Sequence, residues 1–160
     1  ANHHKQVCYI STIIAEEMDC SFSEYRNIFL AFILHDIGAV ALSDGCDLKD
    51  FDIQHCHEHG DIGAKIFNIF TPLNDSADLV KFHHVNWDNG KGNLLGGCQV
   101  KLGSHIIHLA DRFSVLIDPN EQIFGQIPVI YDKLKMNVGS KFHPEVYKAF
   151  IKASEKKAFG

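Results

Sequence analysis

The chain has 160 residues, a formal net charge of −5 at pH 7, 46% hydrophobic residues and 22% charged residues. This length is enough for one domain with a buried core, and these fractions are ordinary for a globular protein. The mild negative charge argues against a nucleic-acid-binding or membrane-binding surface, and the apolar stretches are too short to cross a bilayer. No basic-then-apolar signal pattern opens the chain. We therefore expect a cytoplasmic protein that does not bind DNA.

Cysteine and histidine are the informative residue types. The five cysteines form no CxxC pair, which indicates reduced thiols rather than a disulfide framework or a thiolate zinc site. The eleven histidines, several of them in tight clusters, are unusual for a chain of this length. Because histidine is the commonest metal ligand, this excess of histidine indicates a metal site.

Apolar residues at helical spacing predict a helix over residues 2–18. Ser21-Phe22-Ser23-Glu24 is a candidate capping box for a second helix, which we expect to run to His35-Asp36. Gly38 then stands where a helix would stop. Asp44-Gly45-Cys46-Asp47 indicates a turn.

A further helix is expected from about residue 58 to a stop before Pro72, and a short helix capped by Asn74 or Asp75 then arrives at His83-His84. Residues 86–97 are rich in Gly and Asn and predict a loop. The last helices are predicted over residues 100–117, 128–136 and 143–154, and Pro144 lies in the first turn of the last of them. No stretch alternates with period two, so we predict one all-α domain over residues 1–160.

The stretch Leu34-His35-Asp36-Ile37-Gly38 follows an apolar run, and its His-Asp doublet is the first candidate site. A buried imidazole and carboxylate must be paired or bound, because an unpaired buried charge is expensive. One interpretation is a local hydrogen bond that caps the helix end. The other is a divalent metal ion, since neutral imidazole and carboxylate are both natural ligands.

Five positions hold candidate ligands, each at or near a predicted helix end: His3 or His4, His35-Asp36, the cluster of His55, His57 and His59, the pair His83-His84, and Asp111. Neighbours in mid-helix point about 100° apart, whereas two neighbours at a helix terminus can both turn to one centre. Imidazoles mixed with carboxylates suit iron, manganese or zinc in an open, catalytic type of site.

The order of these motifs resembles the HD superfamily of phosphohydrolases, and more narrowly the HD-GYP family of cyclic di-GMP phosphodiesterases. The resemblance covers nearly the whole chain. The matching segments are His3 with Val7, Leu34-His35-Asp36-Ile37-Gly38, His59-Gly60-Asp61-Ile62-Gly63-Ala64, His83-His84-Val85-Asn86-Trp87-Asp88, Leu109-Ala110-Asp111-Arg112-Phe113, and Phe142-His143-Pro144-Glu145-Val146.

The resemblance implies an HD-domain helical bundle around two, or three, divalent metal ions, with iron or manganese ahead of zinc. Asp36 would bridge two metals, and His35 and Asp111 would hold one of them. His3, which the spacing favours over His4, would complete that site or contribute to a third. The full set of metal ligands implied in this way is His3, His35, Asp36, His59, His83, His84 and Asp111.

Such a site implies hydrolysis of a cyclic dinucleotide, cyclic di-GMP or a relative, by a metal-bridging hydroxide, with Asp36 and His35 at the catalytic centre. The resemblance also implies a bacterial output module of a longer signalling protein, with regulatory domains fused to it or associated with it. The sequence leaves open whether the chain forms a homodimer.

Three departures concern substrate contacts rather than metal ligands. Ala39 replaces the usual lysine, Asn89-Gly90-Lys91-Gly92-Asn93 lacks the GYP signature, and residues 118–122 lack the usual basic residues. Lys91 is a candidate replacement cation or a solvated loop lysine. Trp87 is a candidate substrate contact or a packing residue.

Two other functions therefore stay open: a catalytically inactive metal- or nucleotide-binding regulatory domain, and a nucleotide phosphomonoesterase of the wider superfamily. The double histidine His83-His84 indicates two metals and argues against the simpler phosphomonoesterase site. The remaining histidines are expected on the polar surface or buried with hydrogen bonds. These are His55, His57, His105, His108 and His143. Among them, His108 lies one helical turn before Asp111 and is a candidate to orient that ligand.

Overall fold

The computed structural model describes residues 3–41 and 57–158. In this part of the chain the α-helices are α1 (His3–Glu17), α2 (Phe22–Ile33), α3 (Ile37–Ala41), α4 (His57–Ile69), α5 (Asn74–Lys81), α6 (Leu102–Val115), α7 (Ile123–Met136) and α8 (Pro144–Ala158). Two short 3-10 helices, η1 (Thr71–Leu73) and η2 (Asp88–Asn93), and the strands β1 (Leu94–Leu95) and β2 (Cys98–Gln99) complete it. The expected helical bundle is confirmed, with one small antiparallel hairpin that begins inside the predicted loop and ends just after it.

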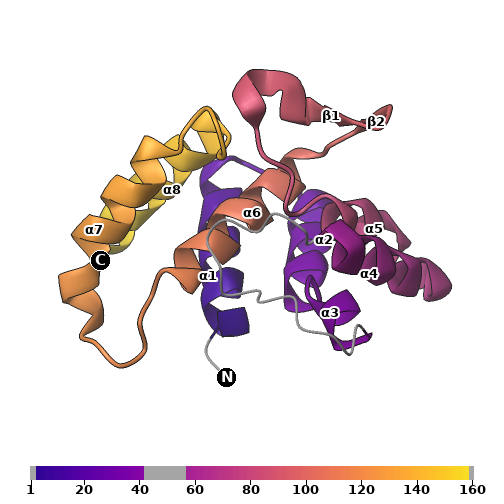
Figure 1. Cartoon of the computed structure of the whole chain (residues 1–160), viewed down its shortest axis with the longest axis horizontal. Helices are drawn as coiled ribbons and strands as arrows, with labels where there is room; N and C mark the ends of the chain where they lie inside the picture. The colour runs from indigo at the N-terminus through magenta and orange to yellow at the C-terminus, as the bar shows by residue number, and fades with distance from the viewer. Residues whose placement is uncertain (1–2, 42–56, 159–160) are drawn as a thin grey trace.

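Helix α6 is the centre of the bundle, and all of residues 103–114 are buried. Helices α1, α2, α5 and α8 contact it. Figure 1 shows α7 and α8 on one side of α6, and α2, α4 and α5 on the other. Because α6 is buried all round, its polar side chains need partners within the protein.

Helix α1 confirms the amphipathic pattern, and its apolar face carries Val7 and Ile14, both fully buried. Its last turn is tied to α8, where Lys152 and Lys156 both bind the carboxylate of Glu17. The expected capping box is also present. The hydroxyl of Ser21 accepts from the amide of Glu24, whose carboxylate accepts from the amide of Ser21 at 2.9 Å.

The His35-Asp36 doublet lies in the turn between α2 and α3, since α2 ends at Ile33. Gly38 does not stop a helix, because it lies inside α3. It instead permits a close helix contact: a Cβ at this position would overlap the carbonyl oxygen of His59 and lie 2.8 Å from the amide nitrogen of Gly63. This contact brings the doublet next to α4.

Two predicted helix starts are wrong. Neither Asn74 nor Asp75 caps α5, because both lie inside the helix and Leu73 occupies the N-cap position without a side-chain bond. Helix α7 begins at Ile123, five residues before the expected start, with Pro128 inside it. The first turn of α7 is held by Gln126, which accepts from the amide of Asp118 at 2.7 Å and donates to its carbonyl at 3.0 Å.

The loop after His84 is fastened to the segment before α8. The amides of Trp87, Asp88 and Asn89 donate to the carbonyls of residues 141, 140 and 139 respectively, at 2.7–3.0 Å. The turn predicted at residues 44–47 lies outside the described residues. In the parts of the chain that the structure describes, no helix has the length and apolar character to span a membrane.

Candidate metal centre

The site residues come from five separate segments. His3 is in the first turn of α1, His35 and Asp36 are in the turn after α2, and His59 is in the first turn of α4. His83 and His84 follow the end of α5, and Asp111 projects from the middle of α6. Helix termini thus supply most of the donors, as the sequence pattern predicts.

His35 and His83 are held by the same local device. Each follows the last residue of its helix by two positions, and its Nδ1 contacts a carbonyl of the final turn: Phe32 at 2.6 Å for His35, and Val80 at 2.5 Å for His83. The last carbonyls of a helix lack partners within the helix, so an Nδ1–H donor satisfies one of them. In the neutral imidazole this leaves the Nε2 lone pair available to a metal ion.

His3 is oriented from α6. Its Nδ1 lies 3.0 Å from the hydroxyl of Ser114, which itself donates to the side-chain oxygen of Gln6 at 2.8 Å. Since that hydroxyl uses its hydrogen on Gln6, it accepts from Nδ1–H of His3. The Nε2 atom of His3 is again left facing the carboxylates.

The first group of donors surrounds one oxygen of each carboxylate. Nε2 of His35 lies 3.1 Å from Oδ2 of Asp36 and 3.6 Å from Oδ1 of Asp111. Nε2 of His3 lies 3.2 Å from the same Asp111 oxygen and 3.9 Å from the same Asp36 oxygen. Spacings of this order are expected between ligands that share one small cation with bonds of about 2 Å.

The second group uses the other oxygen of Asp36. Nε2 of His59 lies 3.3 Å from Nε2 of His83 and 3.1 Å from Nε2 of His84. Oδ1 of Asp36 is 3.9 Å from His59 Nε2 and 4.0 Å from His83 Nε2. Asp36 therefore faces both groups, one oxygen to each.

The electrostatics of the two groups differ. Burial opposes a charge on His35, but the carboxylates of Asp111 and Asp36 outweigh it and raise its pKa to about 10. Burial and the neighbouring His35 and His59 lower the pKa of His83 to about 3, and burial holds the pKa of His84 well below its usual value. The second group therefore presents neutral imidazoles at neutral pH, the form that binds metal.

The donor set fits divalent metal ions. In the second group, Nε2 of His59 lies within 3.3 Å of Nε2 of both His83 and His84. Because the Nδ1 hydrogen of His83 is already directed to the carbonyl of Val80, its Nε2 meets His59 as a lone pair, and a cation between the rings would satisfy these lone pairs. Mixed imidazole and carboxylate donors suit iron, manganese or zinc.

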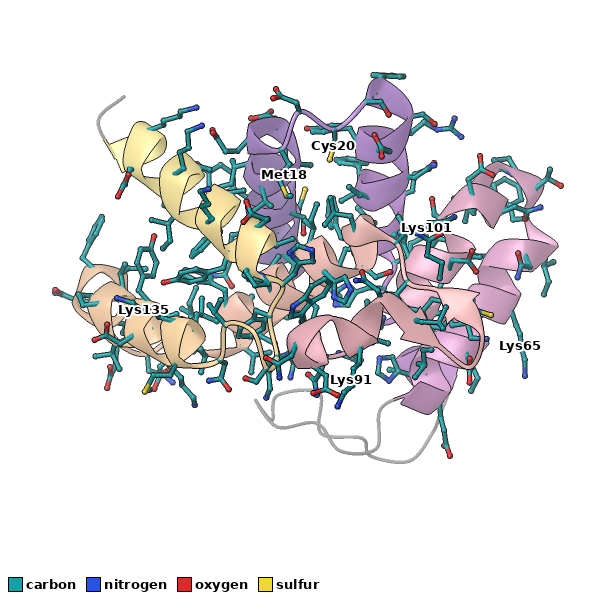
Figure 2. All side chains as sticks on the ribbon, turned by 90° about the horizontal axis from the view of Figure 1, so that it is seen from above. Met18, Cys20, Lys65, Lys91, Lys101 and Lys135 are labelled. Carbon is teal, nitrogen blue, oxygen red and sulfur yellow. The ribbon has the colours of Figure 1, made fainter. Side chains whose placement is uncertain are left out.

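Each of the predicted substrate contacts pairs with a neighbouring side chain in this structure. The ammonium of Lys91 is exposed and 3.5 Å from the carboxylate of Asp88, and Figure 2 shows it at the edge of the molecule. The Trp87 ring packs on His143, with ring centroids 4.0 Å apart, and meets the edge of His105 at 5.4 Å. His55 and the side chain of His57 lie outside the described residues.

The other described histidines are buried or part-buried, one of the two environments expected for them. His143 is part-buried, and its Nδ1 accepts from the amide of Glu145 at 3.1 Å. His105 is buried and faces the backbone of Gly92, and neither of its ring nitrogens has a side-chain hydrogen-bond partner among the described residues. Nδ1 of the buried His108 has none there either.

Sequence reasoning ranked His4 below His3 and passed over two further residues, Ser114 and Arg112. His4 places a ring nitrogen within 4.8 Å of donor atoms of His3, His35 and Asp36, so it joins the first group. Ser114 orients His3, and its position one turn after Asp111 on the same helix is a signal that could have indicated this. Arg112, which binds the carboxylate of Asp111, has no signal beyond its adjacency.

Comparison with known families decides the classification. A family model described as HD domain matches residues 1–116, which include all the donors described above. The chain belongs to the HD domain family. The match confirms the superfamily that the ordered motifs indicate.

Two relatives of this chain carry phosphodiesterase names. A Thermotoga maritima protein named cyclic di-GMP phosphodiesterase is 29% identical over 168 residues, which cover 94% of this chain and 43% of the relative. A Vibrio cholerae protein named 3'3'-cGAMP-specific phosphodiesterase 1 is 28% identical over 116 residues, covering 72% of this chain and 27% of the relative. The chain thus spans less than half the length of each relative.

Proposed function

We propose that this HD domain is the metal-dependent catalytic module of a phosphodiesterase that hydrolyses a cyclic dinucleotide, cyclic di-GMP or a relative. The observation that carries the proposal is that Asp36 presents one oxygen to each of two adjacent donor groups. The names of both relatives support the substrate class. Their greater length supports a module that works with further regulatory domains.

The proposed ligands of the first metal are His3, His35, Asp36 and Asp111, and those of the second are Asp36, His59, His83 and His84. When bound, two such ions, with iron or manganese ahead of zinc as the resemblance implies, would lower the pKa of water for attack on phosphorus and stabilise charge on the phosphoryl oxygens. The protein itself contributes orientation. Carbonyls of α2 and α5 and the hydroxyl of Ser114 hold the imidazole rings, so little reorganisation is needed when metal and substrate bind.

Substrate binding needs positive charge beyond the metals, because the chain is acidic overall. We assign this role to Lys91, whose exposed ammonium can leave Asp88 at small cost, since surface ion pairs are weak. Trp87, partly exposed on the same loop, is the proposed apolar contact. Lys91→Ala is expected to raise KM about tenfold without changing metal content.

The deciding experiment measures metal content per chain on anaerobically purified protein and turnover of cyclic di-GMP and 3'3'-cGAMP on the same sample. Two or more metals per chain, with formation of linear dinucleotide or mononucleotide, are the expected result. Asp36→Asn should lack both metal and turnover. A wild-type chain that binds no metal would refute the proposal.

A second candidate is a metal-binding regulatory domain without turnover. Ala39 and the segment 89–93, which lacks tyrosine and proline, favour this alternative, because they remove groups that the resemblance places on the substrate. Two bound metals with no hydrolysis of either cyclic dinucleotide would support it. Release of phosphate from nucleoside monophosphates would instead indicate a phosphomonoesterase.

A further inference from the structure

Arg112 is a cation buried beside the proposed first metal site. Its side chain is only 2% exposed, and it is the largest of the fully buried side chains described. Buried arginine is rare and must be paired, because an unpaired guanidinium in a protein interior is strongly unfavourable. A residue so placed next to a proposed ligand calls for a functional explanation.

The two residues are consecutive on α6, and the guanidinium folds back onto the neighbouring carboxylate. Nε of Arg112 donates to Oδ2 of Asp111 at 2.9 Å, and Nη2 donates to the same oxygen. The other oxygen, Oδ1, faces the imidazoles of His3 and His35 at 3.2 and 3.6 Å. The two oxygens of the Asp111 carboxylate therefore have different partners: Arg112 holds Oδ2, and only Oδ1 faces the first group of donors.

This division has two consequences for a metal ion. A carboxylate with one oxygen held by two charge-assisted hydrogen bonds has a fixed orientation and offers one oxygen, not two, to a cation. The guanidinium charge also opposes the charge of the ion and draws electron density from Asp111, which weakens the ligand. The first effect favours a defined coordination number, and the second lowers affinity.

We propose that Arg112 is a positioning residue that restricts Asp111 to single-oxygen coordination and makes the first metal site weaker than the second. The proposal rests on the metal centre of the proposed function. It assigns the tighter site to His59, His83, His84 and Asp36. The two sites then fill in order as metal concentration rises, the second before the first.

Two substitutions separate orientation from charge. Arg112→Lys keeps the positive charge but loses the two-donor geometry, whereas Arg112→Gln keeps a hydrogen-bond donor and loses the charge. For Arg112→Lys we expect first-site affinity to fall about tenfold, the size of effect usual for a residue that orients a ligand. For Arg112→Gln we expect first-site affinity to rise about tenfold. Second-site affinity should change less than twofold in both.

The measurement is anaerobic titration of the metal-free protein with Co²⁺. Calorimetry gives the affinity of each step, and visible absorption gives the spectrum of the bound ion. Wild-type protein should bind two ions in two steps, and His84→Ala should weaken the tighter step. The visible absorption of the weaker-bound ion reports its coordination number, which should change in Arg112→Lys, where Asp111 is free to offer both oxygens. A role confined to folding would leave this spectrum unchanged.

The outcomes distinguish the two proposals. If wild-type protein binds no Co²⁺, the proposed metal centre is wrong. If it binds two ions but both Arg112 variants keep wild-type affinities and spectra, or if His84→Ala weakens the looser step, the role assigned to Arg112 is wrong. Melting temperatures of the metal-free variants control for folding, and should Arg112→Gln fail to fold, Arg112→Lys alone decides.

Discussion

Asp36 is the residue on which both donor groups depend. Burial by itself would raise the pKa of its carboxyl, but the nearby His35 outweighs burial and lowers the pKa, so Asp36 is ionised at neutral pH. Each of its oxygens faces a different set of imidazoles. A carboxylate in this position can hold two cations that would otherwise repel each other.

Asp36→Ala is accordingly expected to remove most of the bound metal, because one substitution takes a ligand from each site. Metal content per chain, measured by elemental analysis, checks this. His57→Ala, in the same histidine cluster as His59, is the matched control and should keep the wild-type content. Retention of both metals by Asp36→Ala would show that the two groups do not share a ligand.

His105 predicts a pH effect on stability that is separate from the metal centre. Burial, reinforced by the neighbouring His143, lowers its pKa from 6.5 to about 4. Below pH 6.5 the unfolded chain takes up a proton that the folded protein does not, so the stability of the folded state falls as the pH drops from 6.5 towards 4. Between pH 7.5 and 5.5 the expected loss is about 1 kcal/mol.

The variant His105→Leu should lack this contribution. We expect the loss of unfolding free energy between these two pH values to be about 1 kcal/mol smaller in the variant than in wild type. Urea denaturation of the two proteins in the presence of a chelator measures the difference. Equal losses in both would mean that His105 does not carry the effect.

At the level of elements, the packing of α3 against α4 sets the distance between the His35-Asp36 turn and His59. Gly38 permits this packing because a side chain there would overlap the backbone of His59. The same glycine lies inside α3, where the sequence pattern predicted a helix stop. Its role is therefore one of close approach between two helices.

Gly38→Ala is expected to push α3 and α4 apart, lowering the free energy of unfolding by about 2 kcal/mol, as overpacking usually does, and weakening metal binding. Gly125→Ala in α7 is the matched control. A Cβ there meets no atom of the described residues within 4 Å, so the change should stabilise the helix by up to about 1 kcal/mol. Chemical denaturation together with metal titration checks both variants, and equal metal affinity in the two would contradict the packing argument.

At the scale of the whole molecule, the proposed centre joins segments that are far apart in the chain. His3 and Asp111 meet at 3.2 Å although more than a hundred residues separate them, and α4, α5 and the turn after α2 converge on the same point. Binding energy at such a point stabilises only the folded state, because the unfolded chain does not hold the donors together.

Metal addition should therefore raise the melting temperature. At a metal concentration one hundred times the dissociation constant, the expected stabilisation is about 2.7 kcal/mol per site. Differential scanning calorimetry with and without chelator measures the shift, and Asp36→Ala provides the metal-insensitive control. An unchanged melting temperature in wild type would argue against a centre that joins these segments.

Features that depend on neighbours in the chain were predicted from the sequence alone. The apolar periodicity of α1 and α6, the Ser21–Glu24 capping box and Pro144 at the start of α8 follow from local geometry, because helix faces and caps are set by residues one turn apart. The clusters of histidine at predicted helix ends likewise indicated a metal site, because residue type and spacing are sufficient for that inference.

Only the tertiary structure decided the features that depend on partners distant in the chain. Three features arise from packing between elements: the close contact at Gly38, the burial of His105, and the early start of α7, whose first turn is held by the bond between Gln126 and Asp118. Arg112 stands beside Asp111 in the sequence, but which oxygen it takes depends on how α1 and the turn after α2 approach α6. Local periodicity specifies the elements, and the packing of those elements specifies which buried polar groups meet.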